Sequence, residues 1–375
     1  MVLMTLHIRH IGRPSPVEFI SLPMAAPDDF SALQQRLAAD FTRDDLLALF
    51  IKTPGNGLDN DWSRKLAQHA LAPVLTEPVS GSNEAVAAMP PLRMISGGCE
   101  GFITPHMVAL VARSVPSDMP DEANGTLVAV RAASAPLAEA AIGTAAQIEA
   151  AAATVRDALA ALDVTAEQVS YVHAVTPMTG DGHASKPRSR AATALGAAVA
   201  LGELDLAVAT DALTNTQSEV HGKRCGVTAG DTNGRIDLIV FAQVPVAAAT
   251  PLQQGSRGAT NRQSMHCMSL ANPIDMATVR ACLSNHDVAA VAAVIYKGDP
   301  PADGYLHGEL LGMRGDSDLP AFRHFRAAMS GVLACTTQTS RLLIGGGAEH
   351  QCPVGGGLLT LVLNSKPALQ GEIHD

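Results

Sequence analysis

The sequence predicts an α/β protein built from three similar α/β units. Two observations carry this prediction. A short apolar run breaks into a turn three times at nearly equal spacing, and each run is followed by a helix-type segment and a second run that ends in a turn. The three runs end near Lys52, Val175 and Lys297. Recurrence of these features in one order is typical of internal repeats. Copies arranged about an axis would bring equivalent residues to one shared central site.

The first unit shows the pattern most clearly. Residues 46–52 (LLALFIK) are a β-type run that ends in a Pro-Gly turn, and residues 61–75 carry apolar side chains at helical spacing. Asp61 or Ser63 is positioned to cap that helix. The unit closes with a β-type run that enters a glycine turn at Ser96.

The second and third units repeat this order. In the second unit, YVHAV is followed by a helix-type segment at 189–204, and the closing run ends at Thr228. The Ala-rich segment from Ala133 to Leu162 is interpreted as one further helix of this unit. In the third unit, VAAVIYK is followed by a helix-type segment at 322–336 and a closing run that ends at Gly345.

Boundaries between the units are expected where these signals fade. The stretches 114–124 and 251–262 are polar and contain Pro or Gly, so they are interpreted as linkers. The predicted units are therefore residues 1–113, 124–250 and 263–375.

Composition excludes several classes of protein. The formal net charge is −10 and only 17% of residues are charged, so no basic excess exists to bind nucleic acid. The sequence has no uninterrupted apolar run of about 18 residues, so no membrane span is predicted. The six cysteines form no CxxC pair, and the first residues lack the apolar stretch of a signal peptide. We therefore expect reduced thiols and a cytoplasmic location.

Five segments spread over all three units carry a family resemblance. They are KTPGNGLDNDWSR at 52–64, SGGCEGFITPH at 96–106, SRAATALGAAVALGE at 189–203, RHFRAAMSGVLA at 323–334 and GGAEHQCPVGGG at 346–357. Together they resemble the ring-opening amidohydrolases typified by cyanuric acid hydrolase and barbiturase. A glycine run alone would be weak evidence for any family. The GGG here also does not follow the strand–GxGxxG–helix order of a dinucleotide site.

The resemblance implies a fold, a substrate class and a mechanism. The three α/β units are expected around a pseudo-threefold axis with a central active site, where a small cyclic amide binds. Each unit of the family supplies a Lys, a Ser from a glycine turn and an Arg. A Ser attacks a ring carbonyl while a Lys takes the hydroxyl proton. No cofactor is implied for catalysis, and the family's habit suggests a homo-oligomer.

The departures between units locate the reacting pair. The family's reacting pair is usually placed in unit two, but here only the first unit keeps both members, so we expect the reacting pair to have moved to Lys52 and Ser96. The second unit has Val175 and Thr228 at these places, and the third has Lys297 with a glycine. A second possibility is that Thr228 reacts after activation by another base, for which His173 is the candidate. The predicted substrate-binding residues are Arg64, Gly97, Arg190, Thr228, Ala229, Lys297, Arg326, Gly345 and Gly346.

The resemblance also implies a structural cation near the last glycine turn. The implied ligands are Asp299, Ala348, Gln351, Cys352, Pro353 and Gly356. One carboxylate with backbone oxygens suits a hard ion such as Mg²⁺ or Ca²⁺. Glu349 is interpreted as an acid that stabilises the turn or holds a nearby Arg or Lys, and His350 as a structural residue.

Two functional hypotheses follow. The first is a hydrolase that opens a small cyclic amide (an imide, a ureide or a related heterocycle) other than cyanuric acid itself, because Val175 and Gly345 remove polar groups from two of the three units. The alternative is a diverged homologue that binds a cyclic metabolite or catalyses a non-hydrolytic reaction such as isomerisation. Neither hypothesis involves nucleic acid or a membrane as a partner.

Overall fold

A computed structural model describes most of the chain. The described residues are 10–12, 14–56, 60–76, 90–113, 125–179, 185–215, 218–230, 234–245, 263–284, 291–315 and 318–364. Both predicted linkers, 114–124 and 251–262, lie outside the described residues, so the unit boundaries remain predictions.

The three units have one strand order. Unit one contains β2 (Ser15–Pro23), α1 (Ser31–Ala39), β3 (Leu46–Lys52), α2 (Trp62–Thr76), β4 (Leu92–Ser96) and β5 (His106–Ala112). Its strands are ordered β4-β3-β5-β2, with β3 and β4 parallel and the other neighbours antiparallel. A short strand β1 (His10–Ile11) precedes the unit and pairs with β6 of unit two.

Units two and three repeat this topology. Unit two contains β6 (Thr126–Ala133), α3 (Ala145–Leu162), β7 (Val169–Thr176), α4 (Lys186–Ala200), α5 (Leu206–Ala212), β8 (Cys225–Ala229) and β9 (Asp237–Val244). Unit three contains β10 (Gln263–Leu270), α6 (Met276–Leu283), β11 (Val291–Gly298), β12 (Tyr305–Leu306), β13 (Glu309–Leu310), α7 (Ala321–Thr337), β14 (Leu342–Gly345) and β15 (Gly357–Asn364). The orders β8-β7-β9-β6 and β14-β11-β15-β10 match that of unit one.

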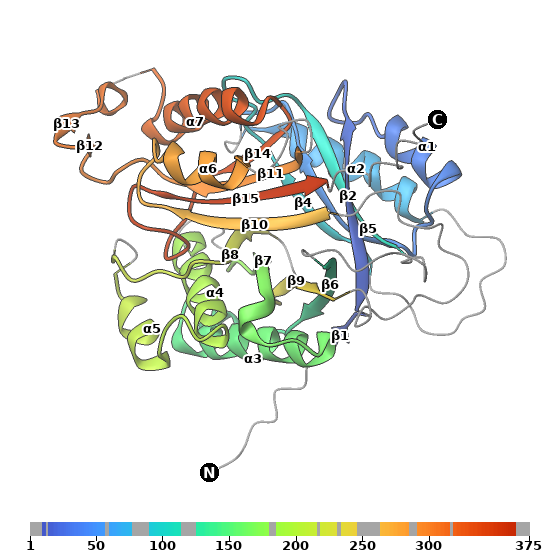
Figure 1. Cartoon of the computed structure of the whole chain (residues 1–375), viewed down its shortest axis with the longest axis horizontal. Helices are drawn as coiled ribbons and strands as arrows, with labels where there is room; N and C mark the ends of the chain where they lie inside the picture. The colour runs from blue at the N-terminus through green and yellow to red at the C-terminus, as the bar shows by residue number, and fades with distance from the viewer. Residues whose placement is uncertain are drawn as a thin grey trace, which may run out of the picture.

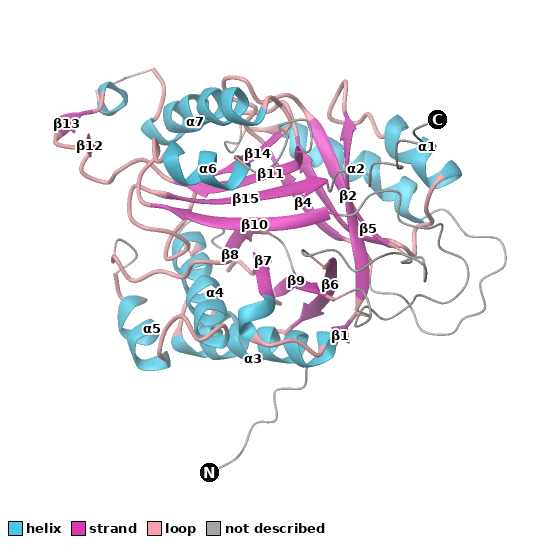
Figure 2. Cartoon of the chain, viewed as in Figure 1, coloured by secondary structure: helices cyan, strands magenta, loops and turns pink. Residues whose placement is uncertain are grey.

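Helices lie outside and sheets face the centre (Figures 1 and 2). Each sheet packs one face under the helices of its own unit, and the other faces of all three sheets meet in one apolar core. This core contains rings from units one and two, including Phe19, Phe50 and Phe241, and the aliphatic side chains of Ile295 and Val362 from unit three. Strands buried on both faces explain the continuous apolar runs in the sequence. The predicted α/β fold of three similar units is therefore confirmed.

The sheets of units one and two are continuous, whereas unit three forms its own sheet. Strand β2 pairs with β6 across the unit boundary, through Ser15 with Ala129 and Pro16 with Val128. The six strands of unit three, four in the main sheet and β12 with β13 in a separate pair, pair only with one another in the described part of the chain. Side-chain packing at the centre, together with hydrogen bonds and ion pairs outside strand pairing, therefore attaches unit three to the other two.

One predicted helix is shorter than the sequence suggested. The segment from Ala133 to Leu162 is not a single helix, because Ala133 ends strand β6, where it pairs with Asp237 of β9. The helix α3 begins only at Ala145. Pro136 and Gly143, which has a positive φ of 75°, separate the two elements. Alanine content favoured a continuous helix, and these two helix-breaking residues override it.

The helix α2 begins as predicted. Asp61 is the capping residue, since its carboxylate accepts the backbone N–H of Ser63 at 2.9 Å. None of the described helices is both long and apolar enough to cross a membrane.

Candidate active site

The parallel strand pairs align the three predicted Lys and Ser positions. Lys52 lies opposite Ser96 in the β3–β4 pair. Val175 lies opposite Thr228 in β7–β8, and Lys297 lies opposite Gly345 in β11–β14. The same strand ends in the three units therefore carry the three pairs that the sequence spacing placed in correspondence.

One cavity of about 240 Å³ lies where these strand ends meet. Every residue predicted to react or to bind substrate lines it, from all three units: Lys52, Arg64, Ser96, Gly97, Arg190, Thr228, Ala229, Lys297, Arg326, Gly345 and Gly346. The apolar part of the lining comes mainly from Phe50, Met94, Ile295 and Leu343. The volume suits a small ligand, and the lining combines an apolar floor with several cationic side chains.

Lys52 and Ser96 are neighbours in this cavity. The Lys52 Nζ atom lies 3.4 Å from Ser96 Oγ. The amine also donates to the carbonyl oxygens of Gly97 at 3.1 Å and Ile344 at 2.6 Å. A neutral amine has two hydrogens and one lone pair, so two hydrogens can bond to the carbonyls while the lone pair faces the hydroxyl. This arrangement is suited to deprotonation of Ser96.

Burial prepares Lys52 for the role of a base. The side chain is 1% exposed, and burial, followed by the positive charge of Arg326, lowers its pKa from 10.5 to about 8. Glu100 acts in the opposite direction and raises this pKa. Because burial disfavours the ammonium form, a useful fraction of the amine is neutral near neutral pH.

Unit three keeps the base without a hydroxyl partner. The pKa of Lys297 is also lowered to about 8, by burial and then by the charge of Arg190. Its Nζ donates to the carbonyl oxygen of Gly346 at 2.7 Å. A side-chain carbon at Gly345 would lie 3.4 Å from the Lys297 Nζ atom. Lys297 therefore stands where a second dyad would form if residue 345 were Ser.

Unit two presents a different polar group. Val175 is buried in the apolar core, 4% exposed, and does not line the cavity. His173, two residues earlier on β7, does line it, and its Nε2 lies 3.3 Å from Thr228 Oγ1. The Nδ1 atom of the same ring lies 3.0 Å from the Tyr171 hydroxyl. The sequence named His173 as a candidate but gave no sign of the Tyr171 contact.

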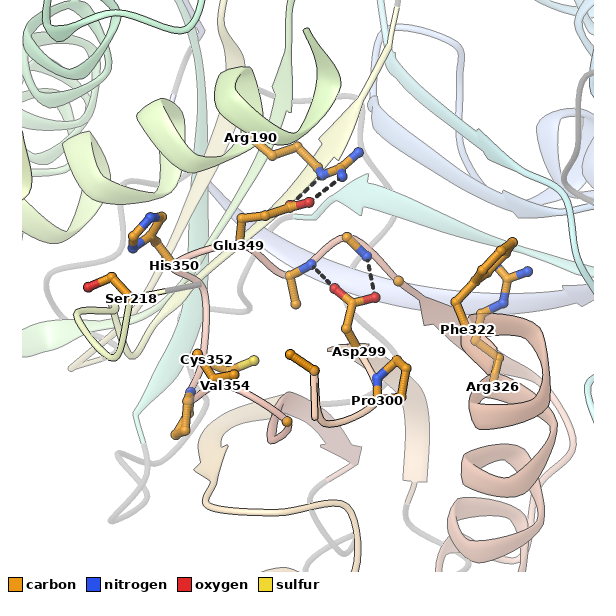
Figure 3. A pocket seen from close by; sticks show the side chains of 16 residues that line it. Arg190, Ser218, Asp299, Pro300, Phe322, Arg326, Glu349, His350, Cys352 and Val354 are labelled. Carbon is orange, nitrogen blue, oxygen red and sulfur yellow. Dashed lines mark hydrogen bonds and ion pairs between the residues drawn. The ribbon is translucent and has the colours of Figure 1, made fainter. Parts of the chain in front are cut away.

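Each of the three predicted arginines is held by a carboxylate. Arg190 makes a two-pronged pair with Glu349, at 2.7 Å from Nε and 2.6 Å from Nη2 (Figure 3). Glu349 therefore holds a nearby Arg, as predicted. Arg326 Nη2 lies 2.6 Å from Glu100, and Arg64 Nε lies 3.7 Å from Asp61.

Two of these pairs join neighbouring units. Glu100 of unit one holds Arg326 of unit three, and Glu349 of unit three holds Arg190 of unit two. Sequence reasoning missed Glu100, although a signal was present. Glu100 follows Ser96 at the same interval as Glu349 follows Gly345. The two acids orient the guanidinium groups that line the cavity.

A second, open cavity of about 510 Å³ adjoins the first (Figure 3). It shares Arg190, Arg326 and Gly346 with the central cavity, and Phe322 on α7 lies beside Arg326. The two arginines thus stand between the central cavity and the surface of the molecule. This position suits an entrance.

The predicted cation ligands already have partners within the chain. Asp299 accepts the N–H groups of Gly347 at 2.9 Å and Ala348 at 2.7 Å (Figure 3). The Gln351 side chain accepts from the N–H of Val227 and donates to the Gly347 carbonyl.

The remaining members of the set are also engaged. The carbonyl of Ala348 accepts from the Gln351 N–H, and that of Pro353 accepts from Gly356. The Gly356 carbonyl accepts from the Tyr296 hydroxyl, and burial raises the pKa of the Cys352 thiol. The described residues contain no cluster of three His, Cys, Asp or Glu side chains suited to a metal. The predicted site has one carboxylate and mainly backbone oxygens, so the cation remains a prediction from the resemblance.

We expect this turn to be held by the Asp299 carboxylate. Asp299→Asn should lower the melting temperature by about 2–4 °C, because two hydrogen bonds to a charged acceptor are weakened. Chelation with EDTA should leave the melting temperature of the unmodified protein unchanged. The control is Asp303→Asn, since Asp303 accepts an N–H in an exposed loop and should matter less. A melting temperature that falls with EDTA and recovers with Mg²⁺ or Ca²⁺ would support the cation instead.

Comparisons with known proteins identify the family of this chain. The profile of the family described as "Amidohydrolase ring-opening protein" matches residues 18–179 and again 173–364. The cyanuric acid amidohydrolase of Methylobacterium sp. (strain 4-46) is 34% identical, over 93% of this chain and 97% of that protein. A cyclic amide hydrolase of Azorhizobium caulinodans is 29% identical, over 92% and 98%.

The solved structures give the same result. The crystal structure of cyanuric acid hydrolase from A. caulinodans has a TM-score of 0.74 at 28% identity and covers 94% of this chain and 100% of that one. The fold and the site thus define a hydrolase-type α/β protein with three concatenated units around one central cavity. The chain belongs to the ring-opening amidohydrolase family.

Proposed function

We propose that this chain opens the ring of a small cyclic amide by hydrolysis, with Ser96 as nucleophile and Lys52 as general base. The observation that carries the proposal is the 3.4 Å between Lys52 Nζ and Ser96 Oγ inside the central cavity. Membership of the family supports the reaction class, since its named relatives include cyanuric acid amidohydrolases and a cyclic amide hydrolase.

The proposed reaction has two stages. Neutral Lys52 takes the Ser96 proton as Oγ attacks a ring carbonyl carbon, and the oxyanion is stabilised by the guanidinium groups that line the cavity. The ring C–N bond then breaks, and the Lys52 ammonium gives its proton to the leaving nitrogen. An ester on Ser96 remains. A water molecule, deprotonated by Lys52, attacks this ester and releases a ring-opened carboxylic acid together with the free Ser96 hydroxyl.

The proposed substrate is a less symmetric ring than cyanuric acid. The three units offer three different sets of groups at equivalent places. Unit one has Lys52 with Ser96, unit two has Val175 with Thr228, and unit three has Lys297 beside a glycine. In unit two the Thr228 hydroxyl lies beside His173, which comes from one step earlier on the same face of the strand. A ring with three identical edges would meet only one matching set. An imide, a ureide or a related heterocycle with unlike edges fits these differences better.

A panel of cyclic amides tests the proposal. Purified protein should convert at least one imide or ureide to a product heavier by one water, at a higher kcat/KM than it shows for cyanuric acid. Mass spectrometry and chromatography of the product measure both outcomes. A ring that is retained tightly without any turnover would instead support a binding protein, and a product of unchanged mass would indicate isomerisation.

A further inference from the structure

We infer that Tyr171 fixes His173 as a hydrogen-bond donor to Thr228. The Thr228 hydroxyl then donates a hydrogen bond to a carbonyl oxygen or ring nitrogen of the ligand, and unit two does not supply a nucleophile. The inference rests on the proposed function and deepens it, because it decides which of the two hydroxyl groups in the cavity reacts. It depends on the side chains of Tyr171, His173 and Thr228, and on the space left by the glycine at position 226.

The phenol reaches His173 only because residue 226 is glycine. Strand register places Gly226 opposite His173, whereas the equivalent pairs in units one and three are Phe50 with Met94 and Ile295 with Leu343. A side chain at Gly226 would collide with the Tyr171 hydroxyl group. Unit two thus exchanges an apolar side chain in the cavity wall for a buried phenol that bonds to an imidazole.

The phenol determines the tautomer of the imidazole. Tyr171 is 1% exposed, and in the described part of the chain its one hydrogen-bond partner is His173 Nδ1, at 3.0 Å. A buried phenol hydrogen without an acceptor would cost about 1–3 kcal/mol. Tyr171 therefore donates, and Nδ1 accepts. Since the neutral ring carries a single hydrogen, that hydrogen is on Nε2.

The ring is neutral under ordinary conditions. Burial, and then the positive charge of Lys297, lower the pKa of His173 from 6.5 to about 3. The phenol also keeps its proton, because burial raises the pKa of Tyr171 well above its usual value. Tyr171 and His173 are thus both uncharged hydrogen-bond donors.

The direction of these hydrogen bonds decides the role of Thr228. His173 Nε2–H donates to Thr228 Oγ1 across 3.3 Å, so the hydroxyl hydrogen of Thr228 is free to turn toward the cavity. The only lone pair of the imidazole ring faces Tyr171 and cannot accept the Thr228 proton. Thr228 therefore donates a hydrogen bond to the ligand. By contrast, Lys52 has a lone pair to offer Ser96.

Nitrogen-15 NMR of histidine-labelled protein tests the tautomer without any need for turnover. His173 should show a protonated Nε2 and an unprotonated Nδ1, and its signals are identified among the 13 histidines by their loss in His173→Gln. Tyr171→Phe should release this tautomer. The matched control is Tyr296→Phe, which removes an equally buried phenol that bonds to the Gly356 carbonyl. A protonated Nδ1 in the unmodified protein would overturn the inference.

Kinetics on a substrate from the panel give the second test. Thr228→Val should raise KM about tenfold, the loss of roughly one hydrogen bond, and change kcat by less than about threefold. Tyr171→Phe should also raise KM, whereas Tyr296→Phe should leave KM unchanged. Loss of kcat in Thr228→Val as complete as in Ser96→Ala would make Thr228 the nucleophile and refute the inference. If no ring is opened at all, the proposed function fails, while the NMR result still decides the tautomer.

Discussion

Ser96→Ala and Lys52→Met should each lower kcat by about a thousandfold or more, while the protein stays folded. In the proposed reaction Ser96 supplies the atom that attacks, and a neutral hydroxyl without its base is a poor nucleophile at pH 7. Methionine keeps the length and apolar stem of Lys52 and removes only the amine. The measurements are kcat on a substrate from the panel and a melting curve for each variant.

The double variant and a matched lysine sharpen this test. Residues that act as one unit have non-additive effects, so Ser96→Ala with Lys52→Met should cost little more than either change alone. Lys297→Met makes the same substitution at the equivalent place in unit three, where the paired residue is Gly345 and carries no hydroxyl. It should raise KM and retain most of kcat. A thousandfold loss of kcat in Lys297→Met, with kcat of Lys52→Met nearly unchanged, would mean that Lys297 and not Lys52 is the base.

The second large effect is on pH dependence. kcat/KM should rise about tenfold per pH unit below pH 8 and level off above it, because Lys52 must be neutral to accept the Ser96 proton and its pKa is lowered to about 8. The sign follows from burial, which disfavours the ammonium form and brings the neutral amine into the accessible range. An ordinary lysine, with its pKa near 10.5, would move the whole rise to higher pH.

Two variants assign the inflection to a residue. Arg326 lowers the pKa of Lys52, so Arg326→Gln should move the inflection to higher pH. Lys297 titrates in the same region, and Lys297→Met should leave the inflection in place. A profile that is flat from pH 6 to 9 in the unmodified protein would contradict Lys52 as the base.

Much of the fold was predictable because the three units repeat their local signals. Apolar runs, turns and helix-type segments specify each strand–helix–strand segment, and equal spacing indicates that Lys52, Val175 and Lys297 occupy equivalent strand ends. The one misjudged element, from Ala133 to Leu162, shows the limit of composition. Alanine is compatible with helix and with buried strand; pairing with β9 places Ala133 in a strand, and Pro136 and Gly143 keep the helix from starting before Ala145.

The set of residues around the cavity was predictable, but their partners were not. Correspondence between units locates Ser96, Thr228 and the three arginines without any knowledge of distances. The contact of Tyr171 with His173 depends on the absence of a side chain at Gly226, which lies on a different strand. The pairing of Glu100 with Arg326 likewise joins residues from different units. Such contacts are set by packing between distant segments.

Because of the carbonyl oxygen of Ile344, the surroundings of the Lys52 amine depend on the docking of unit three. It accepts a hydrogen bond from Lys52, yet it belongs to β14, in a sheet that shares no strand pairing with the sheet of Lys52 in the described part of the chain. A partly unfolded molecule in which unit three has come away would lose this acceptor and the apolar shielding that lowers the basicity of the amine. If Lys52 is the base, chemical competence therefore requires unit three to be docked on unit one, and turnover itself reports whether that docking is complete.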